Sequence, residues 1–237
     1  MMQLSIIIPA YNEEDRIIVT LEKTIDYLRQ QAYESEIIVV SDGSHDTTCA
    51  VAKNFTVAPP VTLRALEYQP NRGKGYAVRY GMLKGCGNIV MFMDADYAVP
   101  IQYLEKGLAL LQKGFDIAIA SRAVAGATVA AHQNTAREFS AKIYTLLQNS
   151  YLGIGYKDTQ CGFKLFTQKA AKKLFAQQKL NSVIFDPEIL WLAKKSGFRV
   201  AEFPVAWRHV EDSRIQYDSL KKSLFVFKEL WRIRRLH

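Results

Sequence analysis

Apolar runs alternate with amphipathic stretches along the first half of the chain. The runs are short and mostly hydrophobic, which predicts strands over 4–8, 36–40, 61–66, 89–93 and 116–120. Between them, apolar side chains recur at helical spacing, which predicts helices over 15–31, 46–55, 75–84 and 100–112. Repeated strand–helix order indicates a Rossmann-like α/β fold, with a mainly parallel twisted sheet and helices on both faces.

The alternation loosens after residue 121. Residues 123–135 are small and polar without a clear period, as in a loop that covers a site. Further along, the pattern predicts helices over 136–152, 168–177 and 187–196, and extended segments over 162–166, 199–203 and 205–208. Residues 219–235 have the spacing of a basic amphipathic helix. We therefore divide the chain into an α/β domain, 1–215, and a C-terminal amphipathic helix, 216–237.

Composition limits the kind of protein this can be. The 237 residues are 49% apolar and 23% charged, which fits one packed domain with a small appendage. No window approaches the roughly 18 uncharged apolar residues of a membrane span, and the N-terminus leads into a predicted strand, not a cleaved signal. Three cysteines without metal-binding spacing indicate a reducing, cytoplasmic setting. The net charge of +8 indicates an anionic partner: nucleic acid, a phosphorylated small molecule or an acidic membrane face.

Two carboxylates, Asp94 and Asp96, directly follow the predicted strand 89–93. The carboxyl edge of an open α/β sheet is where ligands bind. Carboxylates there need a positive partner, and a divalent cation that carries a diphosphate would meet this need. Short acidic triplets are also common in surface turns, so this pair alone does not decide between a metal site and a turn.

Polar residues also follow other predicted strands. Tyr11 can stack on a base, and Asp42 can accept hydrogen bonds from a base or a ribose; the alternative for Asp42 is a tight turn with a helix cap. Lys74 lies in a glycine-rich stretch that either meets a phosphate or is a plain loop before a helix. The spacing is not that of a P-loop, and no Gly-x-Gly-x-x-Gly follows the first strand, which argues against a dinucleotide oxidoreductase.

Several motifs stand in a fixed order. They are Pro9-Ala10-Tyr11-Asn12-Glu13, Ser41-Asp42-Gly43-Ser44-His45-Asp46-Thr47, Asn71-Arg72-Gly73-Lys74-Gly75 and Asp94-Ala95-Asp96. Together they resemble the family 2 glycosyltransferases of the GT-A fold. Later segments are similar to those of dolichyl-phosphate β-glucosyltransferases and, in second place, to those of dolichyl-phosphate mannosyltransferases. These segments are Asp158-Thr159-Gln160-Cys161-Gly162-Phe163-Lys164-Leu165-Phe166, Phe185-Asp186-Pro187-Glu188 and Pro204-Val205-Ala206-Trp207. The resemblance implies a GT-A catalytic domain over 1–215.

The resemblance also implies a donor site. Its residues would be Pro9, Tyr11, Glu13, Asp42, Lys74, Asp94, Ala95 and Asp96. The first four would hold the uridine, and the two aspartates of the triplet would hold Mg²⁺ or Mn²⁺ against the diphosphate. Some mannosyltransferase relatives place a Gln ligand where this chain has Ala98, so a third protein ligand lies elsewhere or is missing.

On the acceptor side, the resemblance implies that Arg122 and Arg137 meet an acceptor phosphate, which suits the bidentate guanidinium. Asp158 would orient the acceptor or bind sugar hydroxyls, with base catalysis as the weaker alternative, because a phosphate monoester is already ionised near pH 7. Arg208 and Arg214 lie near a second phosphate-binding loop of the family, or are ordinary surface charges.

The expected reaction is inverting transfer of glucose from UDP-glucose to a polyprenyl or dolichyl phosphate. The alternatives are a GDP-mannose-dependent transferase, a transferase with a soluble or polysaccharide acceptor, and a nucleotide-sugar-binding protein without catalysis. Nucleic-acid binding is disfavoured, because the basic residues are spread out and the acidic pair would repel a phosphate backbone. The basic residues of the tail, Lys221, Lys222, Lys228, Arg232, Arg234 and Arg235, would hold the enzyme peripherally at a membrane, unless its apolar face packs on the core.

Overall fold

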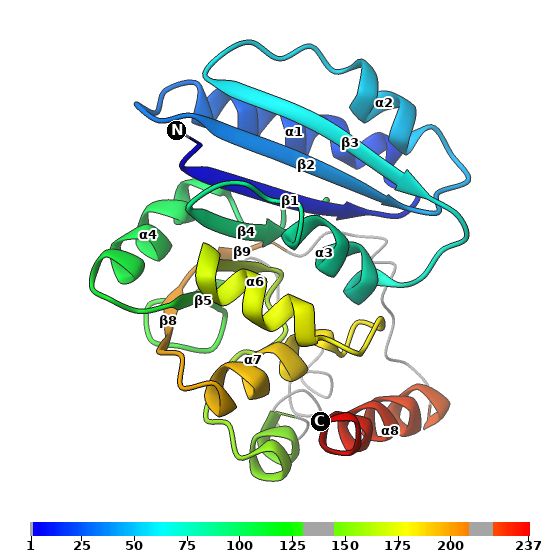
Figure 1. Cartoon of the computed structure of the whole chain (residues 1–237), viewed down its shortest axis with the longest axis vertical. Coiled ribbons are helices and arrows are strands. Elements are labelled where there is room, and N and C mark those ends of the chain that lie inside the picture. The colour runs from blue at the N-terminus through cyan, green and yellow to red at the C-terminus, as the bar shows by residue number, and fades with distance from the viewer. Residues whose placement is uncertain (1, 130–144, 209–219) are drawn as a thin grey trace.

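A computed structural model describes residues 2–129, 145–208 and 220–237 (Figure 1). The strands of its large sheet are β1 (Leu4–Ala10), β2 (Ser35–Asp42), β3 (Val61–Tyr68), β4 (Ile89–Met93), β5 (Ile117–Ser121), β7 (Phe163–Thr167) and β8 (Val200–Pro204). The helices are α1 (Glu14–Leu28), α2 (Thr48–Asn54), α3 (Lys74–Met82), α4 (Leu104–Gln112), α6 (Gln168–Gln177), α7 (Phe185–Lys195) and α8 (Leu220–Leu236). Residues 145–152 are also helical.

The seven strands run in the order β3-β2-β1-β4-β7-β5-β8. All neighbours pair in parallel except β7, which is antiparallel to both β4 and β5. The prediction of a mainly parallel twisted sheet is therefore confirmed, while the reversed direction of β7 was not expected. A second, two-stranded sheet pairs β6 (Thr128–Val129) with β9 (Ala206–Trp207), so the predicted loop 123–135 contains a short strand.

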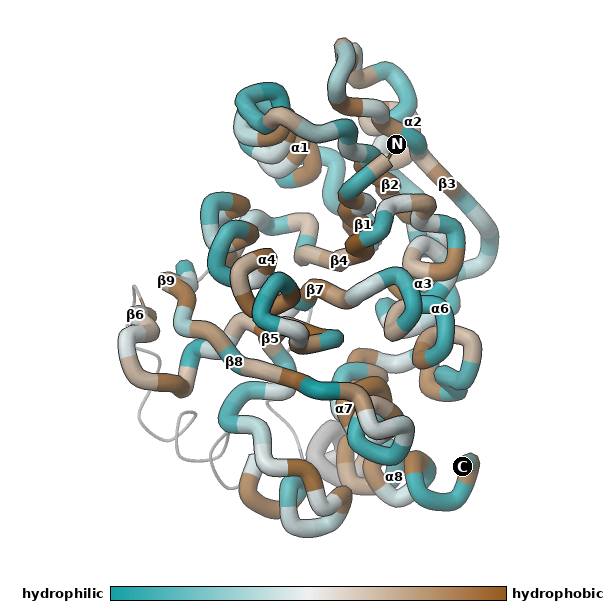
Figure 2. Tube along the Cα trace, turned by 60° about the vertical axis from the view of Figure 1, so that its left-hand side comes forward, coloured by the Kyte–Doolittle hydropathy of each residue, from teal (hydrophilic) through white to brown (hydrophobic). Residues whose placement is uncertain are grey.

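Helices cover both faces of the large sheet and bury its central strands. Successive side chains of a strand point to opposite sides, so each central strand contributes to a core on either face. In β2, Ile38 and Val40 join the core under α3, α6 and α7, whereas Ile37 and Val39 join the core under α1, α2 and α4. Figure 2 shows β1, β4 and β7 as largely hydrophobic segments in the middle of the molecule. This explains why these strands read as apolar runs and not as alternating patterns.

The C-terminal helix α8 packs beside α7, and its side chains Val226, Leu230 and Ile233 belong to the core under α3, α6 and α7. The alternative that its apolar face packs on the protein is thus correct for this face. Other apolar side chains of the helix are exposed: Phe225, Phe227, Trp231 and Leu236. The helix therefore has one buried hydrophobic side, and its exposed surface mixes apolar with basic side chains.

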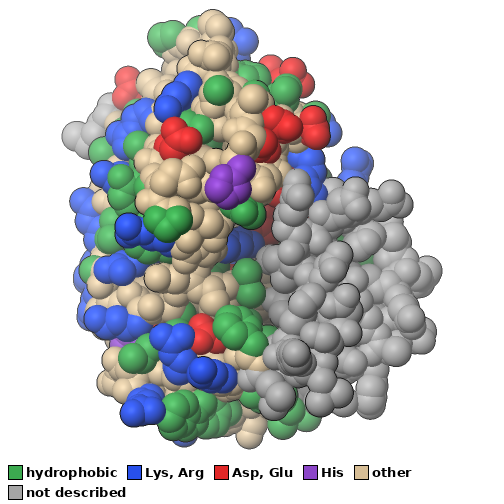
Figure 3. Space-filling view, turned by 90° about the vertical axis from the view of Figure 1, so that its right-hand side faces the viewer, with side chains coloured by type: hydrophobic (Ala, Val, Ile, Leu, Met, Phe, Trp, Pro, Cys, Tyr) green, Lys and Arg blue, Asp and Glu red, His purple; other side chains and the backbone are tan. Residues whose placement is uncertain are grey.

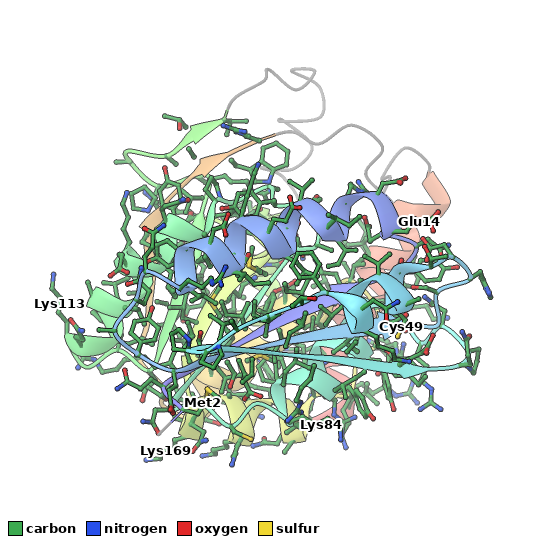
Figure 4. The ribbon with its side chains drawn as sticks, turned by 90° about the horizontal axis from the view of Figure 1, so that it is seen from above. Met2, Glu14, Cys49, Lys84, Lys113 and Lys169 are labelled. Atoms are coloured by element: carbon green, nitrogen blue, oxygen red, sulfur yellow. The ribbon has the colours of Figure 1, made fainter. Side chains whose placement is uncertain are left out.

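The direction of the strands separates two edges of the molecule. Seen from above in Figure 4, Met2 and Lys113 lie toward one end of the sheet, and Glu14 and Cys49 toward the other. Glu14 begins α1 just after β1 ends, so the end of the sheet near Glu14 carries the carboxyl termini of the parallel strands. The turns that carry the predicted site residues follow β1, β2 and β4 and gather at this carboxyl edge.

Candidate active site

Hydrogen bonds tie the turn after β1 to the turn after β2. The backbone N–H of Asn12 donates to Ser44 Oγ (3.1 Å), and the N–H of His45 donates back to Asn12 Oδ1 (2.9 Å). The N–H of Glu13 donates to Thr48 Oγ1 at the start of α2 (2.8 Å). Asn12 adopts a left-handed conformation with φ +54°, which Asn tolerates better than most residues. The two motifs predicted to hold a nucleotide therefore form one connected surface.

The remaining residues predicted for the uridine lie on this surface. Pro9 is buried in β1, and the half-buried ring of Tyr11 lies edge-on to His45, with 6.4 Å between the ring centroids. The carboxylate of Glu13 forms an ion pair with Arg16 (2.5 Å). The structure thus brings these residues together at the carboxyl edge, and their contact with a uridine stays a prediction.

Asp42 binds protein groups with its whole carboxylate. Its Oδ1 accepts from the backbone N–H of Arg72 and from Tyr68 OH (both 2.8 Å), and its Oδ2 accepts from Gly73 N–H (2.9 Å) and Asn71 Nδ2 (3.1 Å). A carboxylate has about four acceptor positions, so these bonds fill it. The side chain is 3% exposed. Asp42 therefore holds the turn before Lys74 in place, and its predicted bond to a base or ribose remains a prediction.

The glycines beside Lys74 serve a close approach within the protein. A Cβ on Gly73, which has φ +97°, would lie 2.5 Å from Asn181 O, and one on Gly75 would lie 2.7 Å from the carbonyl oxygens of Leu180 and Ser182. The N–H of Gly75 donates to Asn181 O (2.8 Å). Approach to a ligand was one reason expected for these glycines. The structure shows another, contact with a segment about a hundred residues later in the chain.

Lys74 opens α3 and forms an ion pair with Asp94, with 2.5 Å between Nζ and Oδ1. Burial acts to lower the pKa of Lys74, but Asp94 and Asp186 outweigh it and raise that pKa. Asp96 accepts the backbone N–H of Ala98 with Oδ1 (3.0 Å). Burial, followed by the charge of Asp94, raises the pKa of Asp96. The charge of Lys74 thus acts on both neighbouring carboxylates.

These two carboxylates suit a divalent cation. Carboxylate oxygens are the ligands that Mg²⁺ prefers, and a cation would relieve the repulsion that raises the pKa of Asp96. The loop between them is anchored, because Thr20 Oγ1 donates to the carbonyl of Ala95 (2.6 Å). Within the described part of the chain no cluster of three His, Cys, Asp or Glu side chains could hold a metal. Among the described residues, such a cation would therefore be held by Asp94 and Asp96.

Arg122 and Asp158 form one bidentate unit. Asp158 Oδ2 accepts from Arg122 Nε (2.7 Å) and from its backbone N–H (2.9 Å), and Oδ1 accepts from Nη2 (3.0 Å). Burial acts to raise the pKa of Asp158, but the guanidinium outweighs it and lowers that pKa. The Arg122 guanidinium also lies over the Trp207 ring (5.5 Å), and Glu202 accepts the backbone N–H of Asp158 (3.0 Å). These contacts fix the direction of the guanidinium.

One short segment connects Asp158 to the acidic pair. The backbone N–H of Asp94 donates to Gly162 O (3.0 Å). Lys164, in β7, donates to Cys161 O (2.6 Å) and pairs with Asp186 at the start of α7 (2.5 Å). We did not predict Lys164 or Asp186 as site residues. A lysine in the middle of an otherwise apolar predicted strand was the signal that could have found them.

Of the other predicted arginines, the structure describes Arg208. Arg208 is exposed, and its backbone N–H donates to Ala98 O (3.0 Å), which places it beside the turn of the acidic pair. Arg137 and Arg214 lie outside the described residues. Figure 3 faces the carboxyl edge and shows acidic and basic side chains both exposed there.

The sequence model of Glycosyl transferase family 2 matches residues 5–175. The chain is 37% identical over 227 residues to a dolichyl-phosphate beta-glucosyltransferase of Trichomonas vaginalis, with 91% of this chain and 67% of that protein covered. It is 35% identical over 225 residues to the dolichyl-phosphate beta-glucosyltransferase of Homo sapiens, with 90% of this chain and 69% of that protein covered.

Among solved structures, the fold is similar to that of glucosyl-3-phosphoglycerate synthase from Mycobacterium tuberculosis in complex with Mn²⁺ and uridine-diphosphate-glucose. The TM-score is 0.70 at 16% identity, with 98% of this chain and 79% of that chain covered. At this identity the likeness shows the fold alone. The predicted GT-A fold class is confirmed.

Proposed function

The chain belongs to glycosyltransferase family 2, and we propose that it transfers glucose from UDP-glucose to a dolichyl or other polyprenyl phosphate. The relatives that support the sugar and the lipid are the dolichyl-phosphate beta-glucosyltransferases, at 35% and 37% identity. The related fold crystallised with Mn²⁺ and uridine-diphosphate-glucose agrees with a nucleotide-sugar donor and a divalent cation.

One observation carries the proposal: Arg122 lies near Asp94, so a site for an anionic acceptor would lie beside a site for a diphosphate. Burial acts to lower the pKa of Arg122, but Asp158 and, more weakly, Cys161 and Asp94 raise it, so the charge of Asp94 reaches the arginine. Among the described side chains, the hydrogen bonds of Arg122 go to Asp158, through Nε and Nη2. Within the described part of the chain Nη1 makes no hydrogen bond, so we expect it to bind a phosphate oxygen. A neutral acceptor would have no use for this arginine.

The reaction needs one displacement. An oxygen of the acceptor phosphate attacks C1 of the glucose on the face opposite the UDP, the bond from C1 to the diphosphate oxygen breaks, and UDP leaves. An α-linked donor then gives a β-linked lipid phosphate. The acceptor is ionised near pH 7, because its second pKa is about 6. Asp158, whose pKa is lowered, is a poor base, and its part is to hold Arg122.

Asp94 and Asp96 would hold the cation, which would neutralise charge on the departing diphosphate. Lys74 lies against Asp94 and can pair with the same phosphates. Asp42 keeps the turn before Lys74 in its conformation, so it orients the lysine. Each of these contributions comes from side chains at the carboxyl ends of strands or at the start of a helix.

We also propose peripheral attachment to the membrane through the exposed side of α8. No described helix is long and apolar enough to cross a membrane. The exposed side carries Phe225, Phe227 and Trp231 beside exposed basic residues: Lys228, Arg234 and Arg235. Aromatic rings with interspersed lysines and arginines are typical of helices that lie in a lipid interface. Arg234 lies over the ring of Tyr151 (5.0 Å), which joins α8 to the helix of residues 145–152.

The test is a product assay. Purified protein is incubated with dolichyl phosphate, Mg²⁺ or Mn²⁺, and a panel of radiolabelled UDP- and GDP-sugars, and the organic phase is counted. We expect lipid-phase label with UDP-glucose. Label from GDP-mannose alone would replace the glucose donor by the mannose alternative. If the label stays in the aqueous phase for every donor, the proposal of a lipid acceptor is wrong.

A further inference from the structure

Lys164 and Asp186 form an ion pair inside the protein that the proposed reaction does not use. Their exposed fractions are 1% and 3%, and 2.5 Å separates Lys164 Nζ from Asp186 Oδ1. Removing two charges from water costs several kcal/mol for each ion, and apolar residues of similar volume often give an equally stable core. Stability alone is therefore a weak reason for this pair.

The lysine of the pair fixes a turn. Its Nζ donates to the carbonyl of Cys161 (2.6 Å), next to Gly162 at the start of β7. Lys164 also lies over the ring of Phe92 in β4 (5.3 Å), so its ammonium is held from several sides. The carbonyl of Cys161 consequently has one strong, charged donor that sets its direction.

The turn at Cys161 and Gly162, held by Lys164, fixes the position of Asp94. The backbone N–H of Asp94 donates to Gly162 O (3.0 Å). A Cβ on Gly162 would lie 2.1 Å from Asp94 Oδ2 and 2.4 Å from Oδ1, so the carboxylate packs directly on the glycine Cα. A small movement of this turn would displace both the backbone and the carboxylate of Asp94.

We propose that Lys164 and Asp186 are positioning residues for the Asp94–Asp96 site. Through the carbonyl of Cys161 and the turn at Gly162, the pair holds Asp94 where it can bind a divalent cation and the donor diphosphate. This inference rests on the cation site of the proposed function, and it assigns a role to side chains that touch neither substrate nor cation.

The test measures Mn²⁺ binding in the presence of UDP, by electron paramagnetic resonance of the free ion, together with thermal stability. The variants are Asp186→Asn and the neutral double variant Lys164→Met/Asp186→Asn. The matched control is Glu36→Gln. Glu36 is also buried and accepts hydrogen bonds from Ser5 Oγ and Cys86 N–H (both 2.6 Å), but it lies in β2 near the opposite edge of the sheet.

We expect both the single and the double variant to bind Mn²⁺ about 10-fold or more weakly than the wild type, the range found when groups that orient metal ligands are removed. The double variant should regain stability over Asp186→Asn, because it buries no unpaired charge, yet still bind the ion weakly. Glu36→Gln should lose stability and bind Mn²⁺ like the wild type.

Two results would overturn the inference. If the double variant binds Mn²⁺ as tightly as the wild type, the pair serves stability only, and the proposed function stands. If the wild type itself does not bind Mn²⁺ with UDP, the cation site fails, and this inference fails with it.

Discussion

At the scale of single residues, the site is built from carboxylates whose partners are already in the protein. Asp42 gives its acceptor positions to the turn before Lys74, and Asp158 gives its own to Arg122. A carboxylate saturated in this way is a scaffold for a cationic side chain. The groups left to meet a ligand are then the cations, Lys74 and Arg122, and the acidic pair Asp94 and Asp96.

Replacing Asp158 by Asn should change how stability depends on pH. Because Arg122 lowers the pKa of Asp158 below the ordinary 3.8, the carboxylate stabilises the fold above that pH, and this contribution is lost as the pH falls toward the lowered pKa. At neutral pH, Asp158→Asn should cost about 3 kcal/mol, the lower end for a broken buried pair. Urea unfolding from about pH 8 to about pH 3 should show that the difference in free energy of unfolding between the variant and the wild type becomes smaller only in acid. A difference in free energy of unfolding that grows in acid would contradict this.

The cysteines should differ in reactivity. Burial raises the pKa of Cys161 to about 12, so only about 1 thiol in 10,000 is a thiolate at pH 8. Cys86 is exposed, whereas Cys49 and Cys161 are buried. Iodoacetamide should alkylate Cys86 in the folded protein and all three cysteines in urea, as read by peptide mass spectrometry. Rapid alkylation of folded Cys161 would argue for a reactive thiol at the site.

At the scale of elements, the start of α3 depends on Gly75, although alanine is ordinarily more stable than glycine within a helix. Gly75→Ala in an ordinary helix adds about 1 kcal/mol of stability. Here the Cβ would lie 2.7 Å from the carbonyl oxygens of Leu180 and Ser182, so we expect a loss of about 1–3 kcal/mol. Transferase activity should fall as well, because Lys74 is the preceding residue. Gly155→Ala, where no atom lies within 4 Å of the Cβ, should leave both unchanged.

The exposed side of α8 should control membrane binding. Replacing Phe225, Phe227 and Trp231 by Ser removes exposed aromatic area and leaves the buried face intact, so the fold should persist. Flotation with phosphatidylserine vesicles should fall roughly tenfold, and wild-type binding should weaken with salt. The matched control replaces Ile18 and Val19, exposed apolar residues of α1, by Ser. If both variants lose vesicle binding equally, α8 is not the element that attaches the protein to the membrane.

The sequence predicted the elements well where burial is complete. The strands β1, β2 and β4 are hydrophobic on both faces, so each was found, and with each strand the polar turn at its end. The antiparallel direction of β7 has no local signal, because it depends on pairing with β4 and β5, far away in the sequence. For the same reason, the packing of one side of α8 could be offered only as an alternative.

The site was predictable in its location and less so in its contacts. Asp94 and Asp96 were expected at one edge from their place after a strand, and Lys74 from its place before a helix, whereas Arg122 was expected there only from the family resemblance. The structure brings these residues close together. Lys164 was missed, because its partner Asp186 lies 22 residues away and only the folded chain brings them together.

At the scale of the whole molecule, the two halves of the proposed reaction would meet along one edge of one sheet. In the proposal, the turns after β1, β2 and β4 form the nucleotide side, and Arg122 after β5 forms the acceptor side with the segment that enters β7. The net charge of +8 suits a protein that meets a phosphorylated lipid in an acidic membrane. Both halves depend on the acidic pair, because Asp94 acts on Lys74 and on Arg122.

The most direct measurement of this dependence is the turnover of the double variant Asp94→Asn/Asp96→Asn with UDP-glucose and dolichyl phosphate, titrated with Mn²⁺. Loss of the cation should cost about 3 kcal/mol or more of transition-state stabilisation, which lowers turnover by about 100-fold or more. The variant should remain folded, since both side chains lie at the sheet edge. A variant that turns over like the wild type, with the same dependence on Mn²⁺, would contradict the proposed cation site and the reaction built on it.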